Sequence, residues 1–165
     1  MAVPCEGWAV DMDGITDIPM RLLIAAVLTS LAVPMVLDAY EDLSCSVAND
    51  RALREMDAIA DAARAVLDGD VGSSMDIGLE LRGWGSATLT SVVIGGAIDP
   101  ARTSEAYMMV FQIELLGRVS SAPDPPIAMT NADGSGGMVL GEGRTHLTVT
   151  HIVIGSVHAA SFSRD

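Results

Sequence analysis

The residues with the clearest spacing for chemistry form a glycine-rich loop in the last quarter of the chain. Asn131, Asp133 and Ser135 place oxygen-bearing side chains at positions 1, 3 and 5, and Glu142 stands at position 12. That spacing resembles the calcium-binding loop of an EF-hand, because Ca²⁺ takes about six to eight oxygen ligands. An EF-hand has a helix on each side, whereas strand-like sequence flanks this loop. The alternative is therefore an Asp-Gly turn that joins two strands.

Three histidines are a second candidate for chemistry. His146, His151 and His158 fall in the last two expected strands, where side chains on adjacent strands could together bind zinc. No cysteine or carboxylate cluster accompanies them at ligand spacing. The preferred interpretation is therefore that all three are polar, solvent-facing strand residues.

Motifs for catalysis are absent from the sequence. It contains no G-x-S-x-G, no phosphate-binding P-loop and no H-E-x-x-H. Its two cysteines, Cys5 and Cys45, match neither a metal spacing nor a redox C-x-x-C. We therefore expect a protein that is not an enzyme and needs no cofactor.

The charge composition argues against nucleic acid as a partner. The chain of 165 residues has a formal net charge of −13, and its nine basic residues are all arginine. A phosphate backbone needs a basic surface, which this composition does not supply. The length fits one domain, or a helix plus one domain.

The most informative element is an apolar segment near the N-terminus, residues 18–37. Its twenty residues carry a single charge, Arg21, and that is enough apolar length to cross about 30 Å of hydrocarbon. Asp17 is expected to cap the helix, with Pro19 in its first turn, and Pro34 is expected to kink it. The alternative is the core helix of a soluble protein. Residues 1–17 before the segment are expected to be a leader or a short N-terminal segment. Cleavage as a secretory signal is not expected, because these residues are acidic.

The helical pattern continues in an amphipathic segment, residues 38–67. Gly69 follows as the expected helix C-cap. Charged residues mark the outer face, with ion pairs expected for Asp50–Arg54, Arg51–Glu55 and Arg64–Asp68. Small and apolar residues recur at spacings of three and four and are expected to form one inner face, namely Cys45, Ala48, Ala52, Met56, Ile59, Ala63 and Val66.

From residue 74 to residue 165 the period changes from helical to strand-like. Short strands are expected near residues 75–81, 87–94, 107–115, 127–130, 138–140, 145–154 and 157–162. The third is expected to turn Tyr107, Met109, Phe111, Ile113 and Leu115 inward. The fold class is therefore α+β, with a long N-terminal hydrophobic helix followed by a small antiparallel β-sandwich or barrel.

The stretch from Gly14 through Leu23, leading into the apolar segment, resembles the N-terminus of archaeal type IV pilin-like proteins. The resemblance in layout covers the whole chain. It implies that a membrane peptidase removes a short leader, residues 1–14, by cutting between Gly14 and Ile15, and that Asp17 is the acidic residue near the new terminus. It also implies that the helix first lies in the membrane and later packs in the core of a filament, with the β-rich region exposed.

The resulting expectation is a structural subunit of a pilus-like filament on the cell surface, a homo-oligomer with no nucleic-acid partner. The alternatives are a single-pass membrane protein whose β-rich region serves adhesion or ligand binding, and an anchored enzyme with an unrecognised site. The residues expected to anchor and assemble the subunit are Leu22, Leu23, Ile24, Val27, Leu28, Leu31, Val33, Val36 and Leu37.

Overall fold

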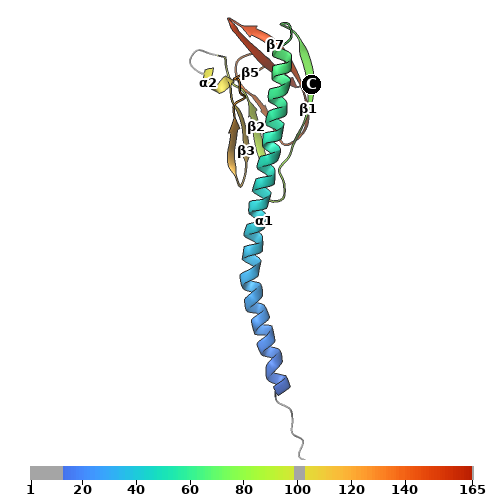
Figure 1. The fold of residues 1–165 in the computed structure, drawn as a ribbon, viewed down its shortest axis with the longest axis vertical. Helices are drawn as coiled ribbons and strands as arrows, with labels where there is room; N and C mark the ends of the chain where they lie inside the picture. The colour runs from blue at the N-terminus through green and yellow to red at the C-terminus, as the bar shows by residue number, and fades with distance from the viewer. Residues whose placement is uncertain (1–12, 99–102, 165) are drawn as a thin grey trace, which may run out of the picture. The chain divides into compact units, whose positions relative to one another are not determined.

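The computed structural model describes residues 13–98 and 103–164, with side chains for residues 18–98 and 104–164. One long helix, α1 (Asp13–Leu67), precedes a region of eight strands that also contains the short helix α2 (Thr103–Ala106) (Figure 1). The chain divides into two compact units between Tyr40 and Glu41, so that the end of α1 belongs with the strands. This is the α+β arrangement expected from the sequence.

The start of α1 differs from the prediction. The helix begins at Asp13 rather than at Ile18, so Asp17 is not its cap and Pro19 lies beyond its first turn. A capping side chain is only a local preference, and no proline or glycine-rich turn before Pro19 stops the helix from extending backwards. Pro19 and Pro34 both lie inside the continuous helix.

The end of α1 is close to the prediction, but its cap is different. Gly69 does not have the left-handed conformation of a glycine C-cap. The last carbonyls are satisfied by other donors instead, because the Ser73 hydroxyl donates to the Val66 carbonyl at 2.9 Å and the Gly69 N–H donates to the same oxygen at 3.2 Å. A Cβ on Gly69 would lie 2.8 Å from Ser73 Oγ. A side chain on Gly69 would therefore press on the hydroxyl that caps the helix.

The strands form two four-stranded sheets with open edges. The first has the order β1 (Ser74–Leu81), β7 (Gly143–Ile154), β8 (Val157–Arg164), β5 (Ala128–Asn131). The second has the order β4 (Gly117–Ser121), β3 (Met109–Ile113), β2 (Leu89–Ile94), β6 (Met138–Leu140).

All seven predicted strands are present, but the purely antiparallel topology is wrong. β5 pairs in parallel with β8, from Ala128 opposite Ala159 to Asn131 opposite Phe162. The two strands are not joined by a hairpin, since β6 and β7 lie between them in sequence, so no tight turn forces them to run in opposite directions. The prediction also missed α2 and the edge strand β4, whose residues are mostly exposed and too polar to show a strand pattern.

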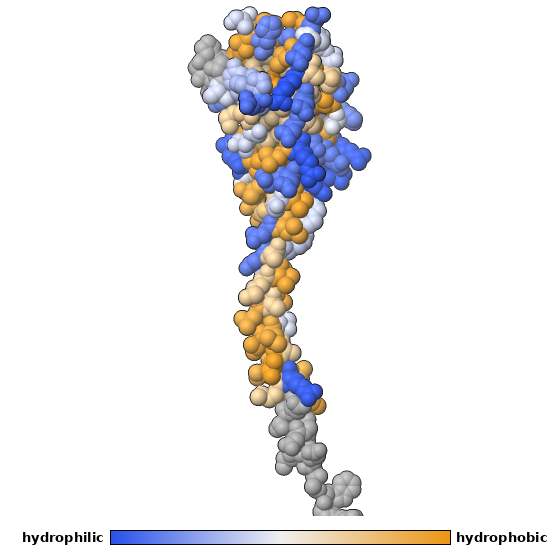
Figure 2. Space-filling model, in the orientation of Figure 1, coloured by the Kyte–Doolittle hydropathy of each residue, from blue (hydrophilic) through white to orange (hydrophobic). Residues whose placement is uncertain are grey.

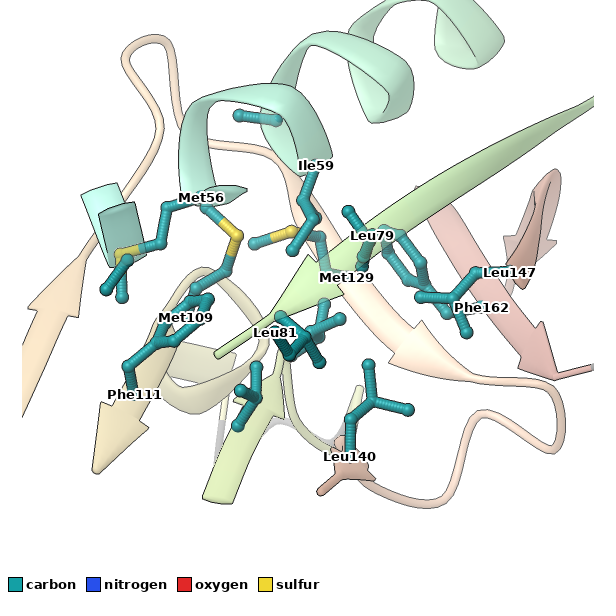
Figure 3. Close-up of a cluster of buried hydrophobic side chains, with 14 of the residues drawn as sticks. Met56, Ile59, Leu79, Leu81, Met109, Phe111, Met129, Leu140, Leu147 and Phe162 are labelled. Atoms are coloured by element: carbon teal, nitrogen blue, oxygen red, sulfur yellow. The ribbon is translucent and has the colours of Figure 1, made fainter. Parts of the chain in front are cut away.

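A single hydrophobic core joins the end of α1 to both sheets (Figure 3). The predicted inner face of the amphipathic segment is confirmed, because Met56 and Ile59 are at most 1 % exposed and lie among side chains from the strands. Cys45 is only partly buried. The labelled strand residues around them are Leu79, Leu81, Met109, Phe111, Met129, Leu140, Leu147 and Phe162.

The predicted inner face of the third strand is confirmed only at its centre. Met109, Phe111 and Ile113 are each 1 % exposed. Tyr107 precedes β3 and is partly buried, and Leu115 lies in the turn after it and is 49 % exposed. Both residues fall outside the strand, so the alternation that buries its centre does not extend to them.

Candidate functional site

The apolar segment, residues 18–37, is helical because nearly all its residues are good helix formers or fit a helix without strain. Leu, Ala and Val are its commonest residues, it contains no glycine, and its two prolines lie near its ends. Arg21 is its only charged residue. The segment is therefore a helix without a polar face.

No side chain in this segment is buried. Its large apolar side chains are between 48 % exposed, at Val33, and 70 % exposed, at Met35. Figure 2 shows apolar side chains covering most of the visible surface of this part of α1. All nine residues expected to anchor and assemble the subunit are exposed, namely Leu22, Leu23, Ile24, Val27, Leu28, Leu31, Val33, Val36 and Leu37.

The hydroxyls inside the apolar segment need no water. Thr29 Oγ1 donates to the Ala25 carbonyl at 2.8 Å, and Ser30 Oγ donates to the Val27 carbonyl at 2.8 Å. Both donors are thus satisfied within the helix itself. That arrangement is compatible with an apolar environment, where an unsatisfied polar group would be costly.

By length and composition, α1 qualifies as a helix that can cross a membrane. The qualifying helix, Ile18–Leu67, contains an 18-residue window with no buried residue. The core helix of a soluble protein passes the same test of length, but it would be mostly buried. A long apolar helix near the N-terminus is compatible with membrane anchoring or with a signal sequence.

The expected processing positions lie at the beginning of α1. The backbone of Gly14, Ile15 and Asp17 is helical, and their side chains are outside the described residues. Residues 1–12, which contain Cys5 and most of the expected leader, also lie outside the described part. Cleavage between Gly14 and Ile15 therefore stays a prediction.

The calcium candidate is a loop between strands. Asn131 ends β5, and its Oδ1 accepts a hydrogen bond from the Ser135 N–H at 3.1 Å, which closes a turn containing Asp133 and Gly134. Glu142 follows β6, and its Oε1 accepts from the Gly83 N–H at 3.4 Å. Two of the four proposed ligands thus already accept backbone N–H groups. Calcium binding at this loop stays a prediction.

The histidines do not share one environment, and the expectation that all three face solvent is wrong for His151. His146 and His158 are exposed, whereas His151 is 4 % exposed. His151 Nδ1 lies 3.1 Å from the Gly69 carbonyl oxygen, and its Nε2 lies 2.8 Å from His158 Nδ1.

The Gly69 carbonyl can only accept, so His151 Nδ1 carries a proton. Its Nε2 accepts from the His158 Nδ1–H when the His151 ring is neutral and donates to His158 Nδ1 when the ring is charged. These two hydrogen bonds link the beginning of β8, through His151 of β7, to the turn that follows α1. Among the described residues, no group of three or more His, Cys, Asp or Glu is arranged to hold a metal ion.

A charged hollow on the second unit was not expected from the sequence. It has a volume of about 300 Å³ and is lined by Arg51, Arg54, Glu55, Glu80 and Arg82. Glu80 pairs with Arg82 at 3.1 Å and with Arg144 at 3.8 Å. Burial raises the pKa of Glu55 and the Glu80 carboxylate adds to the rise, whereas a backbone hydrogen bond from Glu80 opposes it. We refer to the three arginines Arg51, Arg54 and Arg82 with this volume as the arginine hollow.

The ion pairs expected along the amphipathic segment are replaced by other contacts. Arg64 pairs with Asp61 at 2.7 Å instead of with Asp68, and it also donates to the Asp124 carbonyl at 3.1 Å. Arg54 Nε donates to the backbone carbonyl of Asp50 at 3.3 Å. Arg51 and Glu55 line the hollow together with Glu80 of β1. Spacing along the helix alone does not predict this contact with a strand.

A second hollow, of about 630 Å³, lies at β2, β3 and β4. Val93, Met108 and Val110 contribute apolar side chains, and Glu105 and Arg118 contribute charges of opposite sign. Neither hollow is lined by a histidine or by Asp133.

The chain was compared with protein-family models, with curated proteins and with solved structures, and none of the three comparisons gives a match.

Proposed function

We propose that this protein is a non-enzymatic structural subunit of a type IV pilus-like filament on the cell surface. The apolar segment of α1 anchors the subunit in the membrane before assembly and packs against other copies afterwards. The β-rich region with the end of α1 forms the exposed part. The observation that carries this proposal is the uncovered apolar segment, in which no described side chain is buried.

The size of the exposed apolar surface supports the need for a covering. Burying one large aliphatic side chain contributes roughly 1.5–3 kcal/mol. Twelve such side chains between Ile18 and Leu37 are about half exposed or more. Covering them is therefore worth on the order of 10 kcal/mol, before the entropy cost of association. A segment of this kind in water associates with lipid or with other copies.

The layout also fits an assembly helix. Its one charge, Arg21, lies near one end, and its two hydroxyls are satisfied internally. The helix continues into a segment that packs on its own sheets, so each subunit can present the same apolar surface while its β-rich region keeps its fold. A repeated surface on a rigid element is what head-to-tail assembly into a filament requires.

The second candidate is a single-pass membrane protein that does not polymerise and whose β-rich region binds a ligand or a surface. The hollow of about 630 Å³ favours this candidate, because ligand pockets commonly have about 300–1,000 Å³ and combine apolar walls with a few charges. Val93→Asp places a charge among the hollow's apolar residues. If the second candidate is right, this variant should lose binding of the ligand or surface. If the filament proposal is right, it should still form filaments.

The test of the proposal compares Leu28→Asp with Leu115→Asp in the full-length chain. Both leucines are exposed, at 61 % and 49 %, but only Leu28 lies in the apolar segment. A carboxylate at the centre of a membrane helix costs about 2.5–3.5 kcal/mol. We expect Leu28→Asp to abolish both membrane recovery and filaments seen by negative-stain microscopy, and Leu115→Asp to preserve both.

The same comparison can contradict the proposal. If the unaltered chain is recovered from membranes but never forms filaments, the second candidate replaces the first. If Leu28→Asp behaves like the unaltered chain in both measurements, the apolar segment is neither an anchor nor an assembly element.

A further inference from the structure

The arginine hollow has an excess of positive charge on a strongly acidic protein, because three arginines line it together with two carboxylates, Glu55 and Glu80. The chain has a net charge of −13 and nine basic residues, of which three line this one hollow and a fourth, Arg144, reaches Glu80 at its edge. Copies of such a chain repel one another unless opposite charges meet at their contacts. A filament of these copies therefore needs specific places where a cation of one copy meets an anion of the next.

Two of the arginines retain unused capacity for an anion. Glu80 is engaged by Arg82 and Arg144. Among the carboxylates that the structure describes, none lies within 4.0 Å of the guanidinium nitrogens of Arg51 or Arg54. Arg54 uses only its Nε, on the Asp50 carbonyl. A guanidinium presents five N–H donors in a fixed fork that suits a carboxylate, so both side chains can bind an incoming acidic group.

The same helix carries a stretch of acidic residues before the arginines of the hollow. Between Arg21 and Arg51 every charged residue is negative, namely Asp38, Glu41, Asp42 and Asp50. Glu41 and Asp42 are exposed. Copies packed in parallel without an axial shift would place Glu41 and Asp42 against the same acids of their neighbours. That juxtaposition is unfavourable.

An axial shift between copies removes the conflict. Glu41 precedes Arg51 by ten residues and Asp42 precedes Arg54 by twelve, which corresponds to about 15–18 Å along a helix at 1.5 Å per residue. With that shift, the acids of one copy lie level with the arginines of the next. The acids and the arginines belong to the same structural unit, so every copy carries both halves of the contact.

We infer that the arginine hollow receives the Glu41–Asp42 pair of a second copy of this chain, and that this contact sets the axial stagger between neighbouring subunits. The inference rests on the proposed filament function. It adds to that function a defined electrostatic contact, in which carboxylates of one copy bind guanidinium groups of the next. The contact is heterologous, because two different surfaces meet, and so it can repeat without closing.

The experiment measures the critical concentration for filament assembly by sedimentation of the full-length chain. Arg51→Glu with Arg54→Glu, and separately Glu41→Arg with Asp42→Arg, should each raise the critical concentration about fivefold or more, because two attractive pairs become repulsive. The chain with all four substitutions should return to within about twofold of the original value. Its recovery would also show that the separate reversals had not acted by unfolding.

Two further variants act as controls. Arg164→Glu makes half of that change in net charge at an exposed arginine outside both hollows and should leave the critical concentration unchanged. Arg51→Gln with Arg54→Gln removes the positive charges without placing new acids beside Glu55 and Glu80, so it keeps the test valid if the reversed hollow misfolds.

The outcomes distinguish the inference from the proposed function. If the unaltered chain forms no filaments, the proposed function fails and the inference fails with it. If the unaltered chain assembles but the reversal of Glu41 and Asp42 has no effect, or the fourfold variant is not restored, only the inference is overturned.

Discussion

Two parts of one helix differ in what surrounds them. Residues 18–37 carry large apolar side chains in every direction and bury none of them. Residues 41–67 carry charges on one side and bury the opposite side in a core shared with two sheets. The second part has its partner within the chain, whereas the first has none among the described residues. Within one continuous helix, a part that packs in the core thus gives way to an apolar part that no described residue covers.

The largest expected effect on stability comes from shortening a buried side chain of α1. Ile59→Ala should lower the free energy of unfolding by about 2–5 kcal/mol, because Ile59 is 0 % exposed and its loss leaves a cavity between α1 and the strands. Leu28→Ala, the control in the apolar segment, should change it by less than about 0.5 kcal/mol. Denaturant unfolding of the full chain in mild detergent measures both. Similar losses for the two variants would contradict the comparison.

A smaller effect is expected from adding volume. Ala63 is 0 % exposed, where α1 packs on the sheets, so Ala63→Leu should cost about 1–3 kcal/mol through overpacking. Ala32 lies on the exposed apolar segment, so Ala32→Leu should leave the unfolding of the β-rich region unchanged. Thermal unfolding followed by circular dichroism compares the two. An unchanged melting temperature for Ala63→Leu would mean that the helix packs more loosely than its burial indicates.

The end of the helix provides a third test. Ser73→Ala removes the hydroxyl that donates to the Val66 carbonyl and should cost about 1 kcal/mol. Ser156→Ala, at an exposed turn between β7 and β8, should cost nothing measurable. If both serines prove neutral in denaturant unfolding, the hydroxyl does not cap the helix.

The smallest effect concerns the pH dependence contributed by Glu55. Its pKa is raised above the ordinary value of 4.5, chiefly by burial, so the folded chain binds this proton more tightly than the unfolded chain. The contribution of Glu55 to stability is therefore fully present below the unfolded pKa and is lost as the pH rises through the folded pKa. Replacing the carboxyl with an amide removes this dependence.

The free energy of unfolding of Glu55→Gln, relative to that of the unaltered chain, should therefore be higher at about pH 7 than at about pH 4. Glu114→Gln, at an exposed side chain, is the matched control. The difference in unfolding free energy between the two pH values is the quantity to compare. A variant that gains stability on acidification relative to the unaltered chain would reverse the assigned direction of the pKa shift.

The sequence was most informative where a pattern depends on one element alone. The uncharged run between Leu22 and Leu37 and the buried stripe through Met56 and Ile59 follow from composition and helical spacing, so both could be predicted. The strands with strong alternation were likewise predicted, whereas β4 was missed because an exposed edge strand has no buried side to reveal it.

Features that depend on packing between distant segments could not be predicted. The arginine hollow joins residues of α1 to Glu80 and Arg82 of a separate strand region. His151 is buried because its ring reaches the Gly69 carbonyl, which lies far away in sequence. β5 pairs in parallel with β8, whereas β6, which follows β5 in the sequence, belongs to the other sheet. Local pattern carries no information about any of these three contacts.

The most direct test of the central claim is the behaviour of the full-length chain without detergent, measured by analytical ultracentrifugation and by flotation with lipid vesicles. An uncovered apolar segment predicts that the protein floats with the vesicles and, without lipid, sediments as filaments or other large assemblies. A monodisperse, compact monomer that stays in solution and does not float would contradict the account.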